Sequence, residues 1–124
     1  MNNKNKKILV VDDAPEIGRA VSQALKNAGY EADAVLTGKE GIEKIKNNKY
    51  ELILLDLVMP GKSGFEVLKE LRISGLETPI IVYSNLRQDF TRDEALKMGA
   101  SDYFEKAVTP LNDLIEHAKR FLNP

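Results

Sequence analysis

Short apolar runs alternate with amphipathic helical stretches along the whole chain, and this alternation limits the folds that it can adopt. Three of the runs, ILVV at 8–11, LILL at 52–55 and IIVY at 80–83, lack apolar–polar alternation. Such runs are typical of parallel strands that are covered on both faces. The runs at 30–35 and 103–104 are more polar or shorter, so we expect them at the edges of the sheet. With a helix after each strand, the sequence predicts right-handed βαβ units and a parallel α/β sheet.

Local signals predict where two of the later helices begin. Thr91 and Glu94 have the spacing of a capping box, so the fourth helix is expected to start there and to end at Gly99. The pair at 109–110, Thr-Pro, has the pattern of an N-cap followed by proline at the first helical position. In the last helix His117 lies off the apolar face, and we expect it to be solvated.

Length, charge and composition exclude several classes of protein. We expect a single domain over residues 1–124, with a polar tail at 1–6 and no output domain. A net charge of −1 argues against a general nucleic-acid binder. The chain has no cysteine and one histidine, which excludes disulfides, thiol catalysis and histidine metal clusters. No apolar run is long enough for a signal peptide or a membrane span, so we expect a cytoplasmic protein.

Polar side chains follow four of the predicted strands. Asp12 and Asp13 come after the first strand, Asp56 after the third, Ser84 after the fourth and Lys106 after the fifth. In an open parallel sheet, ligands bind at the carboxyl ends of the strands, beside the point where the strand order reverses. We therefore expect these acids, the hydroxyl and the lysine to form one site.

Each of these residues also has an ordinary structural explanation. Asp12 or Asp13 could be the N-cap of the first helix, Ser84 a turn hydroxyl and Lys106 a solvated lysine. Asp56 is harder to explain in this way, because the third helix is expected to begin too far along the chain for Asp56 to cap it.

Three carboxylates that converge on one site repel one another, which raises the pKa of at least one of them unless a cation is present. Carboxylate oxygens that leave room for water and phosphate oxygens suit Mg²⁺. With a lysine beside the metal, such a site favours attack by one carboxylate on a phosphoryl group, which gives an acyl phosphate. Asp56 is the candidate nucleophile, because it directly follows the most apolar strand.

Four stretches and their spacing resemble a known family. ILVVDD, LILLDLVMPGKSG, IIVYS and GASDYFEK are similar to the matching segments of the receiver domains of bacterial two-component response regulators, the CheY-like family. The resemblance covers essentially the whole chain. It implies a flavodoxin-like (βα)5 domain whose five-stranded parallel sheet has the order 2-1-3-4-5, with helices on both faces.

The resemblance also implies how phosphate and metal would be bound. Asp56 would be the phosphoacceptor. Asp12 and Asp13 would bind Mg²⁺ (or Mn²⁺) together with Asp56 and the backbone carbonyl of Val58.

Further roles follow from the same resemblance. Ser84 would be the switch hydroxyl that binds a phosphoryl oxygen, Lys106 would pair with another, and Tyr103 would be the aromatic switch that changes rotamer with Ser84. The other explanation of Tyr103 is an edge-strand aromatic that packs on the last helix. Pro60 and Gly64 match the turn after the acceptor, where a fixed φ precedes a residue that is free to start the helix.

Two positions depart from the family pattern. Ala107 follows Lys106 where the family usually has proline, often after a cis bond. A cis bond to alanine costs about 3–4 kcal/mol, so we expect a trans link or a strained cis one. Asn85 stands where the family prefers alanine or glycine, and its amide is expected to narrow the phosphoryl pocket or to bind the incoming group. These departures predict altered phosphorylation or dephosphorylation rates rather than a dead site.

The leading hypothesis is a signalling switch that catalyses only its own phosphotransfer and autodephosphorylation. Its implied partners are a sensor histidine kinase or phosphotransfer protein, and a downstream protein bound by the fourth helix, last strand and last helix. A phosphorylation-dependent homodimer is also compatible with the family, whereas direct contact with nucleic acid or membrane is not expected.

Two other functions compete with this hypothesis. A receiver fold could serve as an interaction module with weak or no phosphorylation, and Asn85 and Ala107 keep that alternative open. A hydrolase of the haloacid dehalogenase type would need an aspartate two residues beyond its nucleophile, where Val58 stands.

Overall fold

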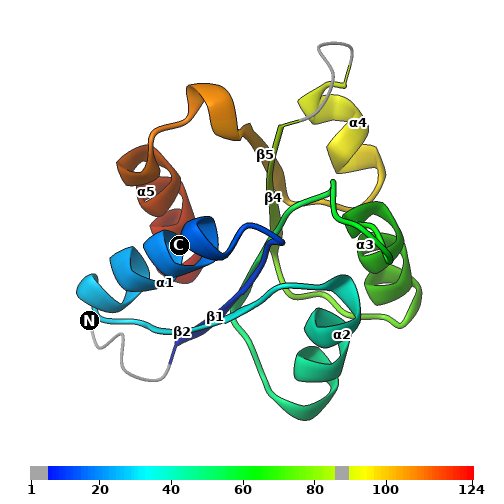
Figure 1. Cartoon of the computed structure of the whole chain (residues 1–124), viewed down its shortest axis with the longest axis horizontal. Helices are drawn as coiled ribbons and strands as arrows, with labels where there is room; N and C mark the ends of the chain where they lie inside the picture. Colours follow the sequence, from blue (N-terminus) through cyan, green and yellow to red (C-terminus); the bar gives the residue numbers. More distant parts are fainter. Residues whose placement is uncertain (1–5, 86–89) are drawn as a thin grey trace.

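Strands and helices alternate through the computed structural model, which describes residues 6–85 and 90–124 (Figure 1). The strands are β1 (Lys7–Val11), β2 (Glu31–Val35), β3 (Leu52–Leu55), β4 (Ile80–Ser84) and β5 (Asp102–Glu105). The helices are α1 (Pro15–Asn27), α2 (Gly38–Asn47), α3 (Gly64–Ile73), α4 (Arg92–Lys97) and α5 (Leu111–Leu122), with a short 3₁₀ turn, η1 (Lys106–Val108), after β5.

The five strands form one parallel sheet in the order β2-β1-β3-β4-β5. The predicted α/β class and strand order are therefore confirmed, and the two weaker runs are the edge strands. All residues of β3 and β4 are buried. Burial on both faces explains why these central strands are apolar without alternation.

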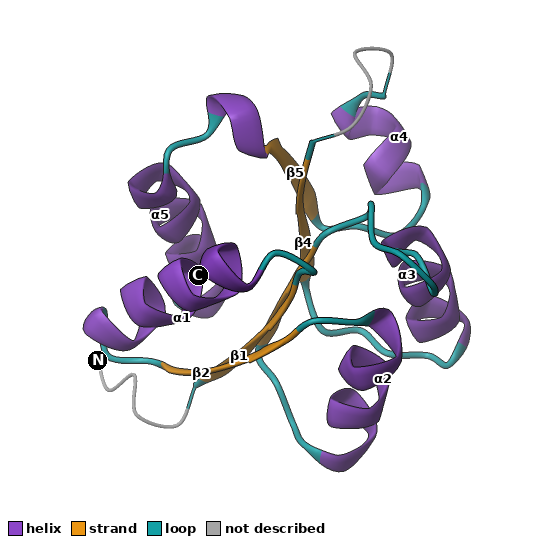
Figure 2. Cartoon of the chain, in the orientation of Figure 1, coloured by secondary structure: helices purple, strands orange, loops and turns teal. Residues whose placement is uncertain are grey.

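Helices cover both faces of the sheet (Figure 2): α1 and α5 lie on one face, and α2, α3 and α4 on the other. Successive side chains of a strand point to opposite faces. In β1, Ile8 and Val10 accordingly pack in the core beneath α1 and α5, whereas Leu9 and Val11 pack in the core beneath α2 and α3. The two faces of the sheet thus pack into separate cores.

Side-chain caps set the start of three helices. Thr37, Ser63 and Thr91 each accept a hydrogen bond from the backbone N–H three residues further on, at the start of α2, α3 and α4. The predicted start of α4 at Thr91 is confirmed. That helix ends at Lys97, and Gly99 follows in the left-handed region with φ of 109°.

The predicted N-cap of the last helix is wrong by one residue. α5 begins at Leu111, and Pro110 rather than Thr109 is its N-cap. The carbonyl of Thr109 accepts a hydrogen bond from the Tyr83 hydroxyl at 3.1 Å. This contact with β4 holds the chain extended at Thr109, so the helix starts later than the local pattern indicates.

His117 is half-buried rather than solvated, which corrects the expectation from the helical pattern. Its ring stacks on Phe104 of β5, with the ring centroids 4.3 Å apart. Arg92 of α4 lies over the same phenyl ring and forms an ion pair with Asp102 at 2.9 Å. Side chains from α4 and α5 thus meet on the edge strand β5.

Residues 1–5 of the expected polar tail lie outside the described part of the chain. Lys6 is half-buried, and its Nζ donates to the carbonyl of Leu122 and to Oδ1 of Asn123. The start of β1 is therefore fastened to the end of α5. Among the described residues, no helix has both the length and the apolar character that crossing a membrane requires.

Candidate functional site

The carboxyl ends of β1 and β3 place two aspartates side by side. Val11 and Leu55 are the last paired residues of these strands. The Asp56 N–H then donates to the Val11 carbonyl at 2.9 Å, which continues the ladder for one residue and brings Asp56 beside Asp12. Both carboxylates are nearly buried, since the two residues are 3% and 4% exposed.

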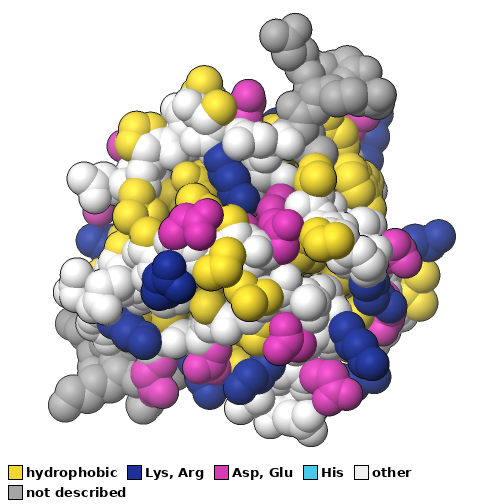
Figure 3. Space-filling model, viewed as in Figure 1, with side chains coloured by type: hydrophobic (Ala, Val, Ile, Leu, Met, Phe, Trp, Pro, Cys, Tyr) yellow, Lys and Arg dark blue, Asp and Glu magenta, His cyan; other side chains and the backbone are white. Residues whose placement is uncertain are grey.

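A third acid, Asp13, lies at the surface next to this pair. Carboxylate oxygens of Asp12, Asp13 and Asp56 all lie within 4.8 Å of one another. On the face shown in Figure 3, acidic side chains gather near the middle with basic side chains beside them. A cluster of hard oxygen donors that is open on one side fits Mg²⁺, which usually keeps several waters among its ligands.

Donors from three segments surround the Asp56 carboxylate. Its Oδ1 accepts a hydrogen bond from Ser84 Oγ at 2.5 Å and from the Val58 N–H at 3.1 Å. Its Oδ2 lies 3.2 Å from Lys106 Nζ. Ser84, which is fully buried, also accepts a hydrogen bond from the Leu57 N–H at 3.3 Å. The structure thus brings together the acids, the hydroxyl and the lysine that the sequence places at strand ends.

Burial and charge pull the pKa values of the site in different directions. Burial raises the pKa of Asp12, and the hydrogen bond and charge of Lys106 offset this rise only in part. The charge of Asp56 contributes least, so desolvation outweighs the expected repulsion between carboxylates. For Lys106, burial alone would lower the pKa, but the hydrogen bond to Asp12 and the charges of both acids outweigh it and raise the pKa.

Two of the ordinary explanations are wrong. Neither Asp12 nor Asp13 is the N-cap of α1, which is Ala14; instead Asp12 Oδ1 accepts the Ala14 N–H at 2.9 Å and orders the loop before the helix. Lys106 is not solvated, because its side chain is 14% exposed and its Nζ lies 2.6 Å from Asp12 Oδ2.

Tyr103 lies apart from the acids and packs in the core on the face of the sheet opposite to α5. It is half-buried and packs edge-on against Phe90, with ring centroids 5.5 Å apart, and Phe90 packs in the same way on Phe65 of α3. Burial raises the pKa of the Tyr103 hydroxyl, with a smaller rise from the charge of Glu105. Packing on the last helix is therefore the wrong explanation of this residue.

The turn after Asp56 depends on glycine for a reason that the sequence did not reveal. Gly64 needs no unusual φ, so the conformational role expected for it is wrong. A Cβ at this position would instead collide with the Asp56 carbonyl oxygen and would lie 2.5 Å from Leu57 Cα. The left-handed residue of the turn is Gly61, with φ of 73°.

The two positions that depart from the family pattern contact each other. Asn85 Oδ1 accepts the Ala107 N–H at 2.8 Å. The Lys106–Ala107 peptide is trans, and the described residues contain no cis peptide bond. Local sequence gives no sign of this pair, because Asn85 follows β4 and Ala107 lies 22 residues further on, in η1.

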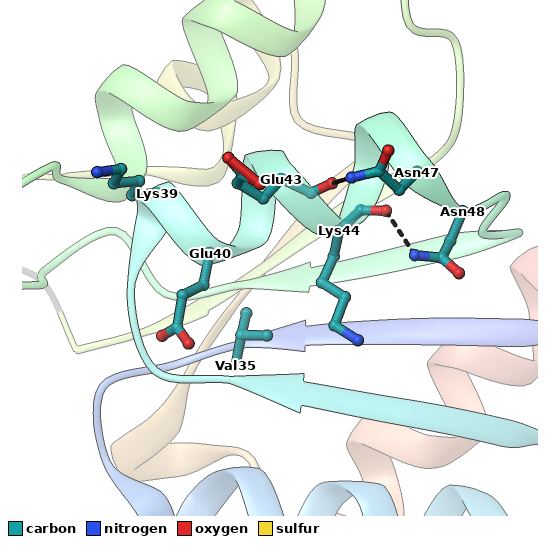
Figure 4. Close-up of a pocket in the computed structure, with 7 residues that line it drawn as sticks. All are labelled: Val35, Lys39, Glu40, Glu43, Lys44, Asn47 and Asn48. Carbon is teal, nitrogen blue, oxygen red and sulfur yellow. Dashed lines mark hydrogen bonds between the residues drawn. The ribbon is translucent and has the colours of Figure 1, made fainter.

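An open groove of about 610 Å³ lies elsewhere, along α2 and the end of β2 (Figure 4). Its lining residues are Val35, Lys39, Glu40, Glu43, Lys44, Asn47 and Asn48. Both asparagine side chains bond to carbonyls of their own helix, and the lysines and glutamates give the groove no net charge. Nothing in this groove matches the chemistry at the strand ends.

Comparison with known proteins agrees with this geometry. A family model for the response regulator receiver domain matches residues 8–119. The transcriptional regulatory protein DltR of Streptococcus agalactiae is 40% identical over 100 residues, which are 81% of this chain and 45% of that protein. The chain spans about half the length of the curated relatives that it matches.

Solved structures are similar over nearly the whole chain. The receiver domain of the Francisella response regulator 1452 has a TM-score of 0.88 and 32% identity, with 94% of this chain and 96% of that chain covered. The response regulator protein TrrA of Thermotoga maritima, in complex with Mg²⁺ and BeF, has a TM-score of 0.81 and 34% identity, with 94% and 98% covered.

Proposed function

Since this chain belongs to the receiver domains of response regulators, we propose that it is a two-component signalling switch that accepts a phosphoryl group on Asp56. The observation that carries the proposal is the environment of the Asp56 carboxylate, which is nearly buried between a hydroxyl, a lysine and two further acids. Even when charges are paired, burying them rarely stabilises a fold more than apolar packing would, so this arrangement favours a chemical role over a structural one.

In the proposed reaction, an Asp56 carboxylate oxygen attacks the phosphorus of a phosphohistidine on a sensor kinase or phosphotransfer protein. The second ring nitrogen of the phosphohistidine is protonated before the reaction. When the P–N bond breaks, its electron pair goes to the first ring nitrogen, and the ring leaves as neutral imidazole that keeps this proton. Asp56 then carries an acyl phosphate. The signal ends by slow hydrolysis of the acyl phosphate. Water attacks the phosphorus, the P–O bond to Asp56 breaks, and inorganic phosphate leaves.

Ser84 and Lys106 would bind the phosphoryl oxygens. The Ser84 hydroxyl, which now donates to Asp56 Oδ1, would donate to one oxygen, and the Lys106 ammonium would pair with another. Both groups are held by the ends of β4 and β5, so they are in place before the phosphoryl group arrives.

Asp12, Asp13 and Asp56 would hold Mg²⁺ (or Mn²⁺), together with the backbone carbonyl of Val58. When bound, the ion supplies positive charge that stabilises the transferring oxygens. The convergence of the three carboxylates supports this assignment, as does the Mg²⁺ and BeF complex of the similar protein TrrA.

We also propose the face formed by α4, β5 and α5 for output, toward a downstream protein or a second copy of the chain. Tyr103, the proposed aromatic switch, supports this face because it contacts Phe90, two residues before α4. The relatives DltR and PhoP are named transcriptional regulatory proteins and are about twice as long as this chain. Where such a protein binds nucleic acid, we assign that contact to its remaining part.

Phosphate incorporation into variants tests the proposal. After incubation with Mg²⁺ and acetyl phosphate, intact mass spectrometry should find one phosphoryl group on the wild type and on the control Asp113→Asn, which changes an exposed aspartate of α5. Asp56→Asn should incorporate none, and chelation of Mg²⁺ should slow incorporation at least about tenfold. Equal incorporation by Asp56→Asn and wild type would refute the assignment of the acceptor. No incorporation by the wild type would favour an interaction module.

A further inference from the structure

One hydrogen bond joins the residues that directly follow the two proposed phosphoryl-binding groups. Asn85 directly follows Ser84, and Ala107 directly follows Lys106. Asn85 Oδ1 accepts the Ala107 N–H at 2.8 Å. Ser84 Oγ lies 2.5 Å from Asp56 Oδ1, and Lys106 Nζ lies 3.2 Å from Asp56 Oδ2. A single side chain therefore links the hydroxyl arm and the ammonium arm of the site.

The bond lies where the sheet can no longer hold these segments together. The pairing of β4 with β5 ends with Ser84 opposite Glu105. Beyond this pair, the segment after β5 enters the η1 turn at Lys106, and the segment after β4 leads toward α4. A side-chain carbonyl oxygen from Asn85 replaces the next backbone acceptor and extends the connection between the strands past the end of the ladder.

The link needs a side-chain acceptor at position 85 and a backbone N–H at position 107. Ala107 supplies a backbone N–H, which proline would lack. The N–H can pair only with the oxygen of the Asn85 carboxamide, so the orientation of that amide is determined by its partner. The two positions that differ from the usual family pattern are thus two halves of one contact rather than independent defects.

We propose that Asn85 and Ala107 act as a unit that holds Ser84 and Lys106 at a fixed separation across Asp56, which makes Asn85 a positioning residue for phosphotransfer. The inference rests on the function proposed above. Without the bond, the two arms would move independently, and both would have to be ordered when the phosphoryl group arrives. The loss should therefore reduce the maximal rate more than it raises the half-saturating concentration of phosphodonor.

A double-mutant cycle tests whether the two residues act together. Phosphorylation by acetyl phosphate at saturating Mg²⁺ is measured for wild type, Asn85→Ala, Ala107→Pro and the double variant. Asn85→Ala should slow the maximal rate about twofold to tenfold in the wild-type background, the usual size for one hydrogen bond. In the Ala107→Pro background the same change should have less than about a twofold effect, because the donor is already absent.

Two results of the cycle would contradict the inference. Equal slowing in both backgrounds, or no slowing in the wild-type background, would overturn the inference. Asn47→Ala is the matched control: Asn47 is another exposed asparagine whose side chain bonds to backbone, at the Glu43 carbonyl, and its loss should leave the rate unchanged. Wild type that takes up no phosphate would refute the proposed function itself, whereas a phosphorylated wild type with additive variants would refute only the pairing.

The Ala107 amide provides a second readout that needs no phosphodonor and no proline variant. In Asn85→Ala, its proton resonance should move upfield and its hydrogen exchange should accelerate about twofold to tenfold, because the acceptor is lost. An Ala107 amide with unchanged shift and exchange would overturn the inference even if phosphorylation slows.

Discussion

Asp56 is nearly buried, and its carboxylate is stabilised by protein donors in place of water. The Ser84 hydroxyl, the Val58 N–H and the Lys106 ammonium all point to its oxygens. An isolated buried carboxylate would cost roughly several kcal/mol, and these donors offset that cost. The Val58 N–H belongs to the local turn after β3, whereas Ser84 and Lys106 reach Asp56 from the ends of β4 and β5, so the sheet supplies the two donors that no local structure could place.

A second paired carboxylate, the half-buried Asp33 far from the site, gives a prediction about pH. The Tyr50 hydroxyl donates to Asp33 Oδ2 at 2.7 Å, and Lys7 Nζ lies 3.4 Å from the same oxygen. Burial would raise the pKa of Asp33, but the hydrogen bond from Tyr50 and the charge of Lys7 outweigh it and lower the pKa. A lowered pKa stabilises the fold above the unfolded value of about 3.9, and this stabilisation is lost as the pH falls through the folded value.

We therefore expect Tyr50→Phe to reduce the free energy of unfolding by about 1 kcal/mol at pH 7, and the difference from wild type to shrink below about pH 4. Urea unfolding at several pH values measures both effects. Tyr30→Phe is the control, because the Tyr30 hydroxyl accepts a hydrogen bond from the uncharged Asn123 side chain at 2.6 Å. Its deficit should not depend on pH over this range, and a pH-independent deficit for Tyr50→Phe would contradict the prediction.

At the scale of elements, one arginine fastens the end of α3 to two neighbouring loops. Arg72 donates to the carbonyls of Leu76, Thr78 and Gly99, each at 2.8 Å. These carbonyls lie between α3 and β4 and after α4, where no strand or helix partner is available. The guanidinium fork can serve several acceptors at once, whereas an ammonium cannot match that planar geometry.

Arg72→Met should lower the free energy of unfolding by about 2–4 kcal/mol, since three hydrogen bonds to a charged group are lost. Arg72→Lys should recover less than half of this loss. Arg19→Met on α1, for which no ion pair is found among the described residues, is the matched control and should change stability by less than about 0.5 kcal/mol. Chemical denaturation gives all three values, and full recovery by lysine would show that charge alone matters at this position.

Sequence predicted the elements that depend on local pattern and missed those that depend on distance between segments. The central strands were predictable because burial on both faces leaves a continuous apolar run, and the acids of the site because they directly follow such runs. The start of α5 was not predictable from local pattern, because Thr109 is held by a hydrogen bond from Tyr83, 26 residues earlier in the chain. The close approach of Gly64 to Asp56 and the bond between Asn85 and Ala107 likewise join segments that no local pattern relates.

For the whole molecule, β5 connects the proposed pocket with the proposed output face. Lys106 follows its last residue and contacts two acids of the site. Further back along the same strand, Tyr103 packs on Phe90 before α4, and Phe104 stacks on His117 of α5. A change at the strand end can therefore reach both helices through rings that are already in contact.

A phosphate mimic tests that connection and separates the switch from the interaction module. With Mg²⁺ and beryllofluoride, amide resonances should shift around Asp56 and also along α4, β5 and α5. Ser84 and Lys106 would turn to the bound group, and β5, which ends just before Lys106, contains Tyr103. Asp56→Asn should show neither set of shifts. Shifts confined to the pocket would reject this face as the output surface, and a wild type without any response would favour a module that works by docking alone. Phe90→Ala should keep the shifts around Asp56 and weaken those on α4, since the ring between Tyr103 and Phe65 would be gone.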